Sequence, residues 1–555
     1  MLPVLNALLA ILYSASCVYL PPTPAFFGFL AVLSFSLIVL FCTISLKKNP
    51  SRFRALRLRK ILEYLPFVLF AGFILRRTGE ADGFFLLDLA SVLLWLASAG
   101  VNLAVLRQLS EKRIAITFPG IEAAKPRKKG LLTQAVEWID ALVQAACLVL
   151  LIQLFFFQLY VIPSESMVPE FMVKDRVVVI KTPSGPKFPL SSVGVPRMKD
   201  YERGDIVIFS NPHYNDSKEA RVKSFLSQFV YMLTFTQVQI NRDEFGQPKA
   251  DPLVKRVTGV PGEKLMMVDG VLYSRTRESA EFQPVAEDSG WAAWNVASLP
   301  RSELALVKNV PLSSEQFDIL QSVESIRSSV DAPAAAAEAR ALADRFDALK
   351  SAPDTVTTAP DLIPSAKLEI SSVFLAVDDV TRLLLTTNGG ALWFREFMTG
   401  WASSAERDTL FETRSMQMNI LLKLTFGKLV VRNAEMIAAG TPSSAYMNDE
   451  VRLSLLSEAD SWYFFMAVHD QRNMFEFPSG DEFIPEDSYF MMGDNRFNSL
   501  DMRHSYKSRL IPVDSGDPSS FRYRSNLDPR YVHASSILGS AALRFWPLSR
   551  IGIPR

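Results

Sequence analysis

The feature that most constrains the fold is a run of residues, Ala141–Ile162, without a single charged side chain. A helix needs about 20 apolar residues to cross the hydrocarbon core of a bilayer, which is about 30 Å thick. The run is long enough, so residues 138–162 are predicted to form a transmembrane helix. The chain that follows Ile162 then begins at a membrane surface.

Other apolar runs precede this one. Leu2–Leu20 and Ala25–Leu46 carry no charge, Gly83–Leu106 carries one acidic residue, and Ile61–Leu75 is shorter and more marginal. The mean hydropathy of +0.15, with 21% charged residues, fits membrane spans attached to a soluble part. Residues 1–137 are therefore expected to form a transmembrane region with about four spans, which makes 138–162 the fifth.

Two basic segments predict how these spans are oriented. Lys47–Lys60 and Arg107–Lys129 each contain seven Lys or Arg residues. Basic loops stay on the cytoplasmic side of a membrane. If both are cytoplasmic loops, the amino terminus is also cytoplasmic and everything after Ile162 lies on the outer side.

Beyond the membrane region the pattern changes to short β-branched runs. Arg176–Lys181, Asp205–Phe209 and Val254–Gly262 are predicted strands. The uncharged stretch Phe225–Ile240 fits an interfacial or strand segment and, equally, a core hairpin. From about 265 to 483 the composition changes again, with an alanine-rich helix at Ala334–Lys350 and no reactive motif.

Ser164 and Ser166 stand in a turn between Pro163 and Pro169, directly after the long apolar run. The prolines restrict the backbone on both sides of the serines. A serine held in this way is a candidate nucleophile, although the same pattern also fits an ordinary helix-exit turn.

Lys255 is the candidate base for such a serine. On a strand it shares one face with Leu253 and Val257, and apolar neighbours disfavour the charged form of an amine. A neutral lysine amine takes a proton from a serine hydroxyl without any histidine. The alternative is that Lys255 and Arg256 form a solvated basic pair at a strand edge.

A third segment, Gly493–Arg503, is dense in Asp, Asn, Ser and Arg and follows the apolar run Tyr489–Met492. Its composition predicts a loop held by side-chain hydrogen bonds and Asp–Arg pairs. A generic polar turn is the alternative. A calcium loop of the EF-hand type is excluded because no acidic residue stands at its closing position.

Together these segments resemble one family, the bacterial type I signal peptidases or leader peptidases, which use a Ser–Lys dyad. The matching motifs occur in the family's order: Pro163-Ser-Glu-Ser-Met-Val-Pro169, Arg203-Gly-Asp-Ile-Val-Ile-Phe209, Val254-Lys-Arg-Val-Thr-Gly-Val-Pro-Gly262, Met492-Gly-Asp-Asn-Arg496 with Asn498, Ser499, Asp501 and Arg503, and Phe545-Trp-Pro-Leu-Ser-Arg-Ile-Gly552. The resemblance covers about 200 residues and leaves out the membrane region and the block from 265 to 483.

The resemblance implies a role for each matching residue. Ser166 would be the nucleophile, Lys255 the general base, Ser164 an oxyanion donor and Ser499 the residue that orients Lys255. The remaining implied residues support the loop or line the substrate pockets: Asp494, Arg496, Asp501 and Arg503 for the loop, and Ile162, Pro163 and Val254 for the pockets. Phe497 and Leu253 depart from the family's pattern, at positions where an acidic residue and an aromatic residue respectively occur in relatives.

The expected fold is a multi-span α-helical membrane region followed by a mostly β signal-peptidase-type catalytic domain with a large α+β insertion. Its catalytic core would comprise 163–264 and 484–555, separated by a non-catalytic insertion at 265–483. The expected protein is a serine endopeptidase of the cytoplasmic (inner) membrane, with its catalytic domain on the periplasmic side. It would remove amino-terminal signal peptides from exported preproteins.

No metal or organic cofactor is implied. The expected partners are preproteins and membrane lipid, with the secretion translocon as a further candidate, and the balance of 59 basic to 58 acidic residues gives no reason to expect nucleic acid. All three cysteines lie in apolar runs, so no disulfide framework is expected in the soluble part. Two alternatives are a self-cleaving repressor with the same dyad and a catalytically inactive homologue that acts as a membrane scaffold. The several spans and the lack of a helix-turn-helix segment argue against the repressor.

Overall fold

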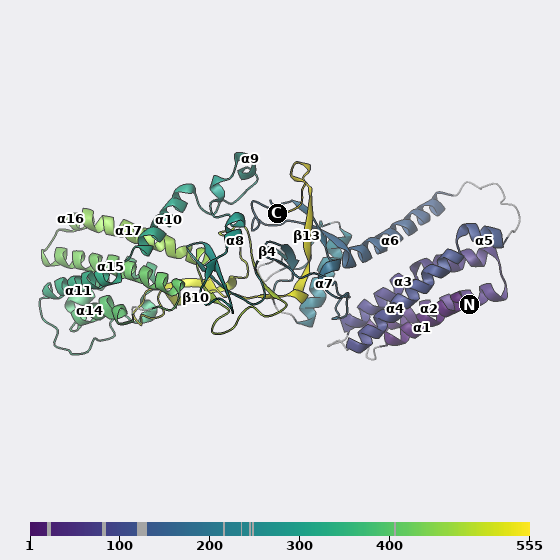
Figure 1. Ribbon diagram of the computed structural model, residues 1–555, viewed down its shortest axis with the longest axis horizontal. Helices are drawn as coiled ribbons and strands as arrows, with labels where there is room; N and C mark the ends of the chain where they lie inside the picture. The colour runs from purple at the N-terminus through teal and green to yellow at the C-terminus, as the bar shows by residue number, and fades with distance from the viewer. Residues whose placement is uncertain are drawn as a thin grey trace.

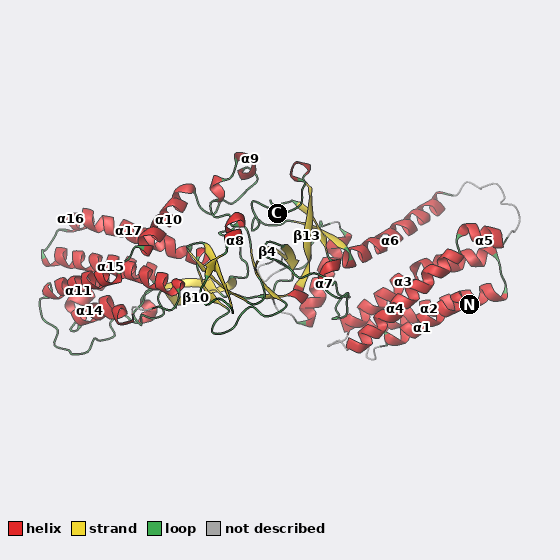
Figure 2. Cartoon of the chain, viewed as in Figure 1, coloured by secondary structure: helices red, strands yellow, loops and turns green. Residues whose placement is uncertain are grey.

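The computed structural model describes residues 1–18, 24–79, 85–118, 130–214, 217–234, 236–242, 246, 249–404 and 407–555. The molecule is elongated (Figure 1). A helix bundle forms one end and a second helical region forms the other, while the strands gather between them (Figure 2). This order of parts confirms the expected fold class.

The amino-terminal helices pack into an antiparallel bundle. Gly72 lies against Val32 and Gly28 against Leu75, so small residues allow close approach of two helices that run in opposite directions. Buried polar groups join the helices as well: the Asn6 amide donates to Asn102 Oδ1 at 2.8 Å. The bundle comprises α1 (Leu2–Ser16), α2 (Pro24–Lys48), α3 (Arg52–Gly79), α4 (Phe85–Gln108) and the short α5 (Glu111–Thr117).

Three helices of the described residues are long and apolar enough to cross a membrane: Ala25–Lys48, Phe85–Gln108 and Leu131–Phe155. Of the five spans expected from the sequence, three qualify by length and composition among the described residues. α1 has only 15 residues, and α3 carries arginines at both ends.

The first basic segment is not a loop throughout. Lys47 and Lys48 end α2, and the residues from Arg52 to Lys60 form the first turns of α3. Of the second segment, α5 is described, whereas residues 119–129 lie outside the described part of the chain.

The predicted fifth helix, 138–162, needs correction at both ends. The helix α6 (Leu131–Phe155) starts earlier and ends at Phe155, and β1 (Phe157–Val161) follows it. The last residues of the uncharged run pair with a neighbouring strand, where aromatic and β-branched side chains pack well. The absence of charged residues predicted an apolar segment of this length, but not the point at which it changes from helix to strand.

The largest sheet is antiparallel throughout its pairings, and its strand order is β1-β2-β13-β3-β4-β9-β12. Strands from both ends of the post-membrane sequence therefore alternate in one sheet. Three of its strands correspond to predicted ones. The members not yet given are β2 (Arg176–Ile180), β3 (Ile206–Phe209), β4 (Leu253–Gly259), β9 (Ser488–Met492), β12 (Val532–His533) and β13 (Ile537–Trp546).

A second antiparallel sheet has the order β7-β6-β5-β8 and shares a buried core with the first. Met267 of β5 and Met474 of β8, both fully buried, lie in the same cluster as Val257 of β4. Its strands are β5 (Glu263–Val268), β6 (Val271–Thr276), β7 (Gln283–Pro284) and β8 (Met474–Phe477), and a separate hairpin joins β10 (His504–Pro512) to β11 (Arg522–Leu527). The expected insertion boundary at 264/265 thus falls inside β5.

Residues 301–472 form the second helical region, which we call the helical insertion. Capping boxes at Ser313 and Thr409 start two of its helices, and Asp331 caps a third. Its core also includes Phe521, which directly precedes β11, and Tyr523 of β11, so the hairpin fixes it to the sheets. Its helices are α9 (Arg301–Leu304), α10 (Ser314–Ser328), α11 (Ala332–Ala348), α12 (Ile370–Leu375), α13 (Val377–Thr386), α14 (Gly390–Thr399), α15 (Leu410–Ala438), α16 (Ser443–Met447), α17 (Glu450–Ala467) and α18 (His469–Arg472).

Two further helices lie outside these groups, α7 (Lys218–Leu233) and α8 (Ala286–Trp291). α7 corrects the interpretation of Phe225–Ile240 as a strand or core hairpin, because most of that stretch is helical. The Ser217 hydroxyl caps α7 by accepting from Ala220 N at 3.3 Å. α7 lies near the junction of the bundle and the sheets (Figure 1).

Candidate active site

Ser166 lies in the connection between β1 and β2, which the sheet holds at both ends. Ile162 N donates to Asp175 O at 2.9 Å and Lys174 N to Ile162 O at 2.8 Å, so the connection is closed at its base. Met167 and Phe171 anchor it from inside, because both are almost fully buried against the sheet. The backbone that carries Ser166 is therefore fixed by packing on one side.

Lys255 of β4 points at this serine. Its Nζ lies 2.5 Å from Ser166 Oγ, and the residue is only 3% exposed. Burial lowers the pKa of Lys255 to about 8, although Asp501 and Asp494 partly oppose that shift. The desolvation expected from the strand pattern is thus present, and the solvated basic pair is not found.

The other two predicted serines lie close to the pair but differ in their contacts. Ser164 is exposed, and its hydroxyl donates to Ser166 Oγ at 3.4 Å. Ser499 is buried, and its Oγ has no hydrogen-bond partner among the described residues. The expected Ser499–Lys255 hydrogen bond is therefore not formed in this structure.

The loop after β9 forms hydrogen bonds to the backbone of the turn that carries Ser166. Asn495 N donates to Ser166 O, and Asn495 Nδ2 donates to Glu165 O, both at 3.1 Å. Gly493 permits this approach, since a Cβ there would lie 2.4 Å from Ser166 O and 2.2 Å from Ser499 Oγ. Asn495 stands inside a motif quoted for the resemblance, but the sequence assigned it no role.

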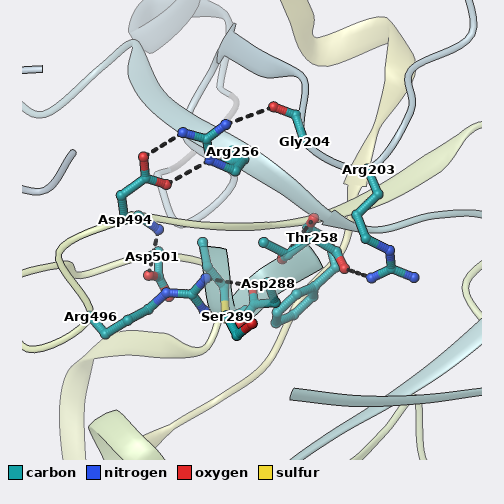
Figure 3. Close-up of polar contacts among 12 residues, drawn as sticks. Arg203, Gly204, Arg256, Thr258, Asp288, Ser289, Asp494, Arg496 and Asp501 are labelled. Carbon is teal, nitrogen blue, oxygen red and sulfur yellow. Dashed lines mark hydrogen bonds and ion pairs between the residues drawn. The ribbon is translucent and has the colours of Figure 1, made fainter. Parts of the chain in front are cut away.

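Buried ion pairs hold this loop from two directions (Figure 3). Asp494 forms a bidentate pair with Arg256 of β4, at 2.8 and 2.6 Å, with both side chains at most 2% exposed. Arg496 pairs with Asp288 of α8 at 2.5 Å. The sequence predicted Asp–Arg support for the loop but not these partners, which lie more than 200 residues away.

Asp501 and Arg503 pair with each other inside the loop. Arg503 donates to both carboxylate oxygens, at 2.8 and 2.9 Å, and Gly493 N adds a third bond at 2.9 Å. Burial alone would raise the pKa of Asp501, but the Arg503 guanidinium outweighs it and holds the pKa below its ordinary value. Asp501 is therefore charged at neutral pH.

Two of the three predicted pocket residues, Ile162 after β1 and Val254 of β4, meet in one apolar cluster although three strands separate β1 from β4 in the sheet. Ile162 is buried, Pro163 is exposed, and Val254 is partly buried against the same apolar cluster as Ile162. Phe497, which departs from the family's pattern, packs its ring on Trp294 with centroids 5.4 Å apart.

Glu165 was missed as a supporting residue, although it stands between the two serines. Its carboxylate is 6% exposed and accepts from Lys308 N, from Asn309 N at 3.1 Å and from Asn498 Nδ2 at 3.3 Å. The sequence around Glu165 gives no indication of these distant backbone partners. Through them, Glu165 joins the start of the helical insertion directly to the turn that carries Ser166.

Comparison with known protein families finds a match to the family described as signal peptidase, peptidase S26, over residues 135–307 and 428–546. These ranges cover slightly more than half of the chain and leave 308–427 unmatched. No curated protein and no solved structure matches the chain.

The Asp494–Arg256 pair generates a stability prediction. Asp494→Leu or Arg256→Met alone should lower the free energy of unfolding by about 3–5 kcal/mol, because each leaves a buried charge unpaired. The double variant should lose less than the sum of the two. Urea denaturation of the purified full chain measures this, and strictly additive losses would contradict a coupled pair.

The contacts of Glu165 generate a second stability prediction. Glu165→Ala should destabilise the fold by about 1–3 kcal/mol for each buried donor left without an acceptor. Glu165→Gln keeps one acceptor oxygen and should cost less. Glu287→Ala, at an exposed acidic residue of α8, is the matched control and should leave the urea midpoint unchanged. A Glu165→Ala midpoint equal to that of the control would show that the carboxylate contributes nothing.

Proposed function

Because the chain belongs to the signal peptidase family, peptidase S26, we propose that it is a membrane-bound serine endopeptidase that removes amino-terminal signal peptides from exported preproteins. Ser166 is the nucleophile and Lys255 the general base. The observation that carries the proposal is the 2.5 Å contact between Lys255 Nζ and Ser166 Oγ in a buried setting.

The chemistry follows from the charge state of Lys255. A protonated amine has no lone pair to accept the serine proton, so only the neutral form acts as a base. Ser166 Oγ attacks the scissile carbonyl carbon while its proton passes to Lys255 Nζ. Lys255 then gives this proton to the leaving amine, and the mature chain departs.

Water completes the reaction by hydrolysing the ester between Ser166 and the signal peptide. Lys255 takes a proton from the attacking water and returns it to Ser166 Oγ as the ester bond breaks. Serine and lysine end in their starting protonation states, so no cofactor is consumed.

The oxyanion formed in both steps needs hydrogen-bond donors. Among the described residues, the backbone N–H of Ser166 donates to no acceptor, and the Ser164 hydroxyl lies beside Ser166 Oγ. We assign these two groups to the oxyanion site. We assign to Ser499, whose buried hydroxyl has no partner among the described residues, the role of orienting Lys255.

The position of the site suits a substrate anchored in the membrane. The bundle and α6 adjoin the sheets at one end, while the amino terminus and the basic residues of α5 lie at the opposite end (Figure 1). Basic segments mark the cytoplasmic side. This arrangement supports a cytoplasmic amino terminus and a catalytic domain on the outer side, where small-residue cleavage sites emerge.

The pKa of Lys255 sets the expected pH dependence. Its value of about 8 lies below the ordinary lysine value of 10.5, so the neutral fraction and the single-turnover cleavage rate should rise as pH passes through about 8. Lys255→Arg should be inactive at every pH tested, because a guanidinium stays protonated. Lys367→Arg, at an exposed lysine, serves as the control and should retain the wild-type profile. Substantial cleavage by Lys255→Arg would rule out the dyad.

Replacing the serines separates nucleophile from oxyanion donor. Ser166→Ala should abolish cleavage of a preprotein whose signal peptide ends in Ala-x-Ala, and Ser164→Ala should slow it by about 10²–10³. Both variants should match wild type in melting temperature. Ser457→Ala, on the exposed face of α17, should cleave normally. Wild-type cleavage by Ser166→Ala would leave the inactive scaffold as the better interpretation.

A further inference from the structure

A second hollow lies away from the serine, where the helix bundle meets the sheets. It has a volume of about 650 Å³. Its walls come from the end of α3, from the chain after β2, from the start of α7, and from residues just before β4 and β13. These segments are distant in the sequence and meet only in the folded chain.

The lining of this cavity is strongly basic. Five cationic side chains border it, Arg77, Lys187, Lys218, Arg221 and Lys249, whereas Asp251 is the only acidic residue among those that line it in the described part of the chain. The whole chain has a net charge of only +1, so this local excess is not a consequence of general basicity. Serine hydroxyls, including Ser192, Ser210 and Ser536, supply further donors.

The fold holds several of these cations in place. Arg77 is 9% exposed, its Nε donates to Leu190 O at 2.9 Å, and an ion pair with the buried Asp88 at 3.4 Å offsets its charge, so the other four cations carry the local excess. Lys218 Nζ donates to Gly79 O at 3.0 Å, and Lys249 Nζ lies 4.0 Å from the centroid of the Tyr214 ring. The Gly79 carbonyl and the Tyr214 ring are both neutral, although Asp251 lies close enough to Lys249 for their charges to interact. The Asp251 carboxylate accepts from Asn211 N at 3.1 Å.

The cavity lies at the level where the apolar helices end. Arg77 is in the last turn of α3, and α6 ends at Phe155. Phe188, next to Lys187, inserts its ring into the bundle core, 4.9 Å from Phe155 and 5.8 Å from Trp95 between ring centroids. The wall that carries Lys187 is therefore fixed at the end of the apolar helix α6, which is where lipid headgroups would lie around a membrane-spanning α6.

Apolar surface adjoins the basic residues on α7. Lys218 and Arg221 occupy its first turns, whereas Leu226 and Leu233 further along are 46% and 43% exposed. Helices with this distribution lie at membrane interfaces, with the apolar side chains toward the acyl region and the basic ones toward the headgroups. Leu75 of α3, two residues before Arg77, is also exposed and adds apolar surface next to it.

We propose that this cavity binds the phosphate headgroup of an anionic phospholipid, with its acyl chains along the exposed apolar side chains of α3 and α7. Several cations around one site favour a phosphodiester over a neutral ligand. The same donors would accept a free phosphate ion, but the apolar surface next to them favours the lipid.

The test is equilibrium binding to the full chain in nonionic detergent. The probes are dihexanoyl phosphatidylglycerol, dihexanoyl phosphatidylcholine and inorganic phosphate. The pocket variant is Lys187→Gln/Arg221→Gln/Lys249→Gln. The control is Arg340→Gln/Lys507→Gln/Arg509→Gln, which removes the same charge from exposed positions elsewhere.

Wild type should bind phosphatidylglycerol at least tenfold more tightly than phosphatidylcholine or phosphate. The pocket variant should lose at least tenfold in affinity for phosphatidylglycerol alone, whereas the control should stay within twofold of wild type. If the pocket variant fails to fold, as judged by its melting temperature, Lys187→Gln alone should weaken phosphatidylglycerol binding by about threefold.

Three results would overturn the proposal. Equal losses in the pocket and control variants would show attraction by net charge only. Equal affinity for the two lipids would show that the headgroup charge is not recognised. Phosphate binding as tight as that of phosphatidylglycerol would assign the cavity to a free ion.

Discussion

The structure depends on one constraint: a buried amine beside a serine hydroxyl keeps a lowered pKa only if the surrounding chain prevents carboxylates from pairing with it. Lys255 meets this constraint on β4, between β3 and β9. The two carboxylates whose charges act on it are already paired, Asp494 with Arg256 and Asp501 with Arg503. If either carboxylate bound the lysine instead, its pKa would rise and the neutral base would be lost.

The support for this arrangement comes largely from chain that the motifs do not include. Asp288 of α8 holds Arg496, and the backbone at Lys308 and Asn309 binds Glu165. All three positions fall within the region expected to be a non-catalytic insertion, 265–483. That region contributes no reacting group in our proposal, but it fixes both the serine turn and the loop that grips it. The family match continues to residue 307 and so includes Asp288, whereas Lys308 and Asn309 lie just beyond it.

Short sequence patterns predicted secondary structure and the burial of individual residues. The β-branched runs at β2, β3 and β4 and the helix α11 are where periodicity places them, and the buried setting of Lys255 follows from its apolar strand neighbours. Long-range partners could not be predicted, because nothing near Asp494 or Arg496 indicates Arg256 or Asp288. The change from α6 to β1 was missed for a related reason: an uncharged run suits a membrane helix and a buried strand equally well, and only pairing with β2 decides between them.

The strand β1 also sets part of the distance between the end of α6 and Ser166. Ser166 lies 11 residues beyond the end of α6 at Phe155, and five of those residues are extended in β1. At about 3.3 Å per residue, the strand alone extends roughly 16 Å along its own direction. Under the proposed function, the substrate must present a stretch of unfolded chain that reaches from its membrane anchor to Ser166. Under that proposal, the distance from the apolar segment of a signal peptide to its scissile bond is a selection criterion, independent of which small side chains enter the pockets.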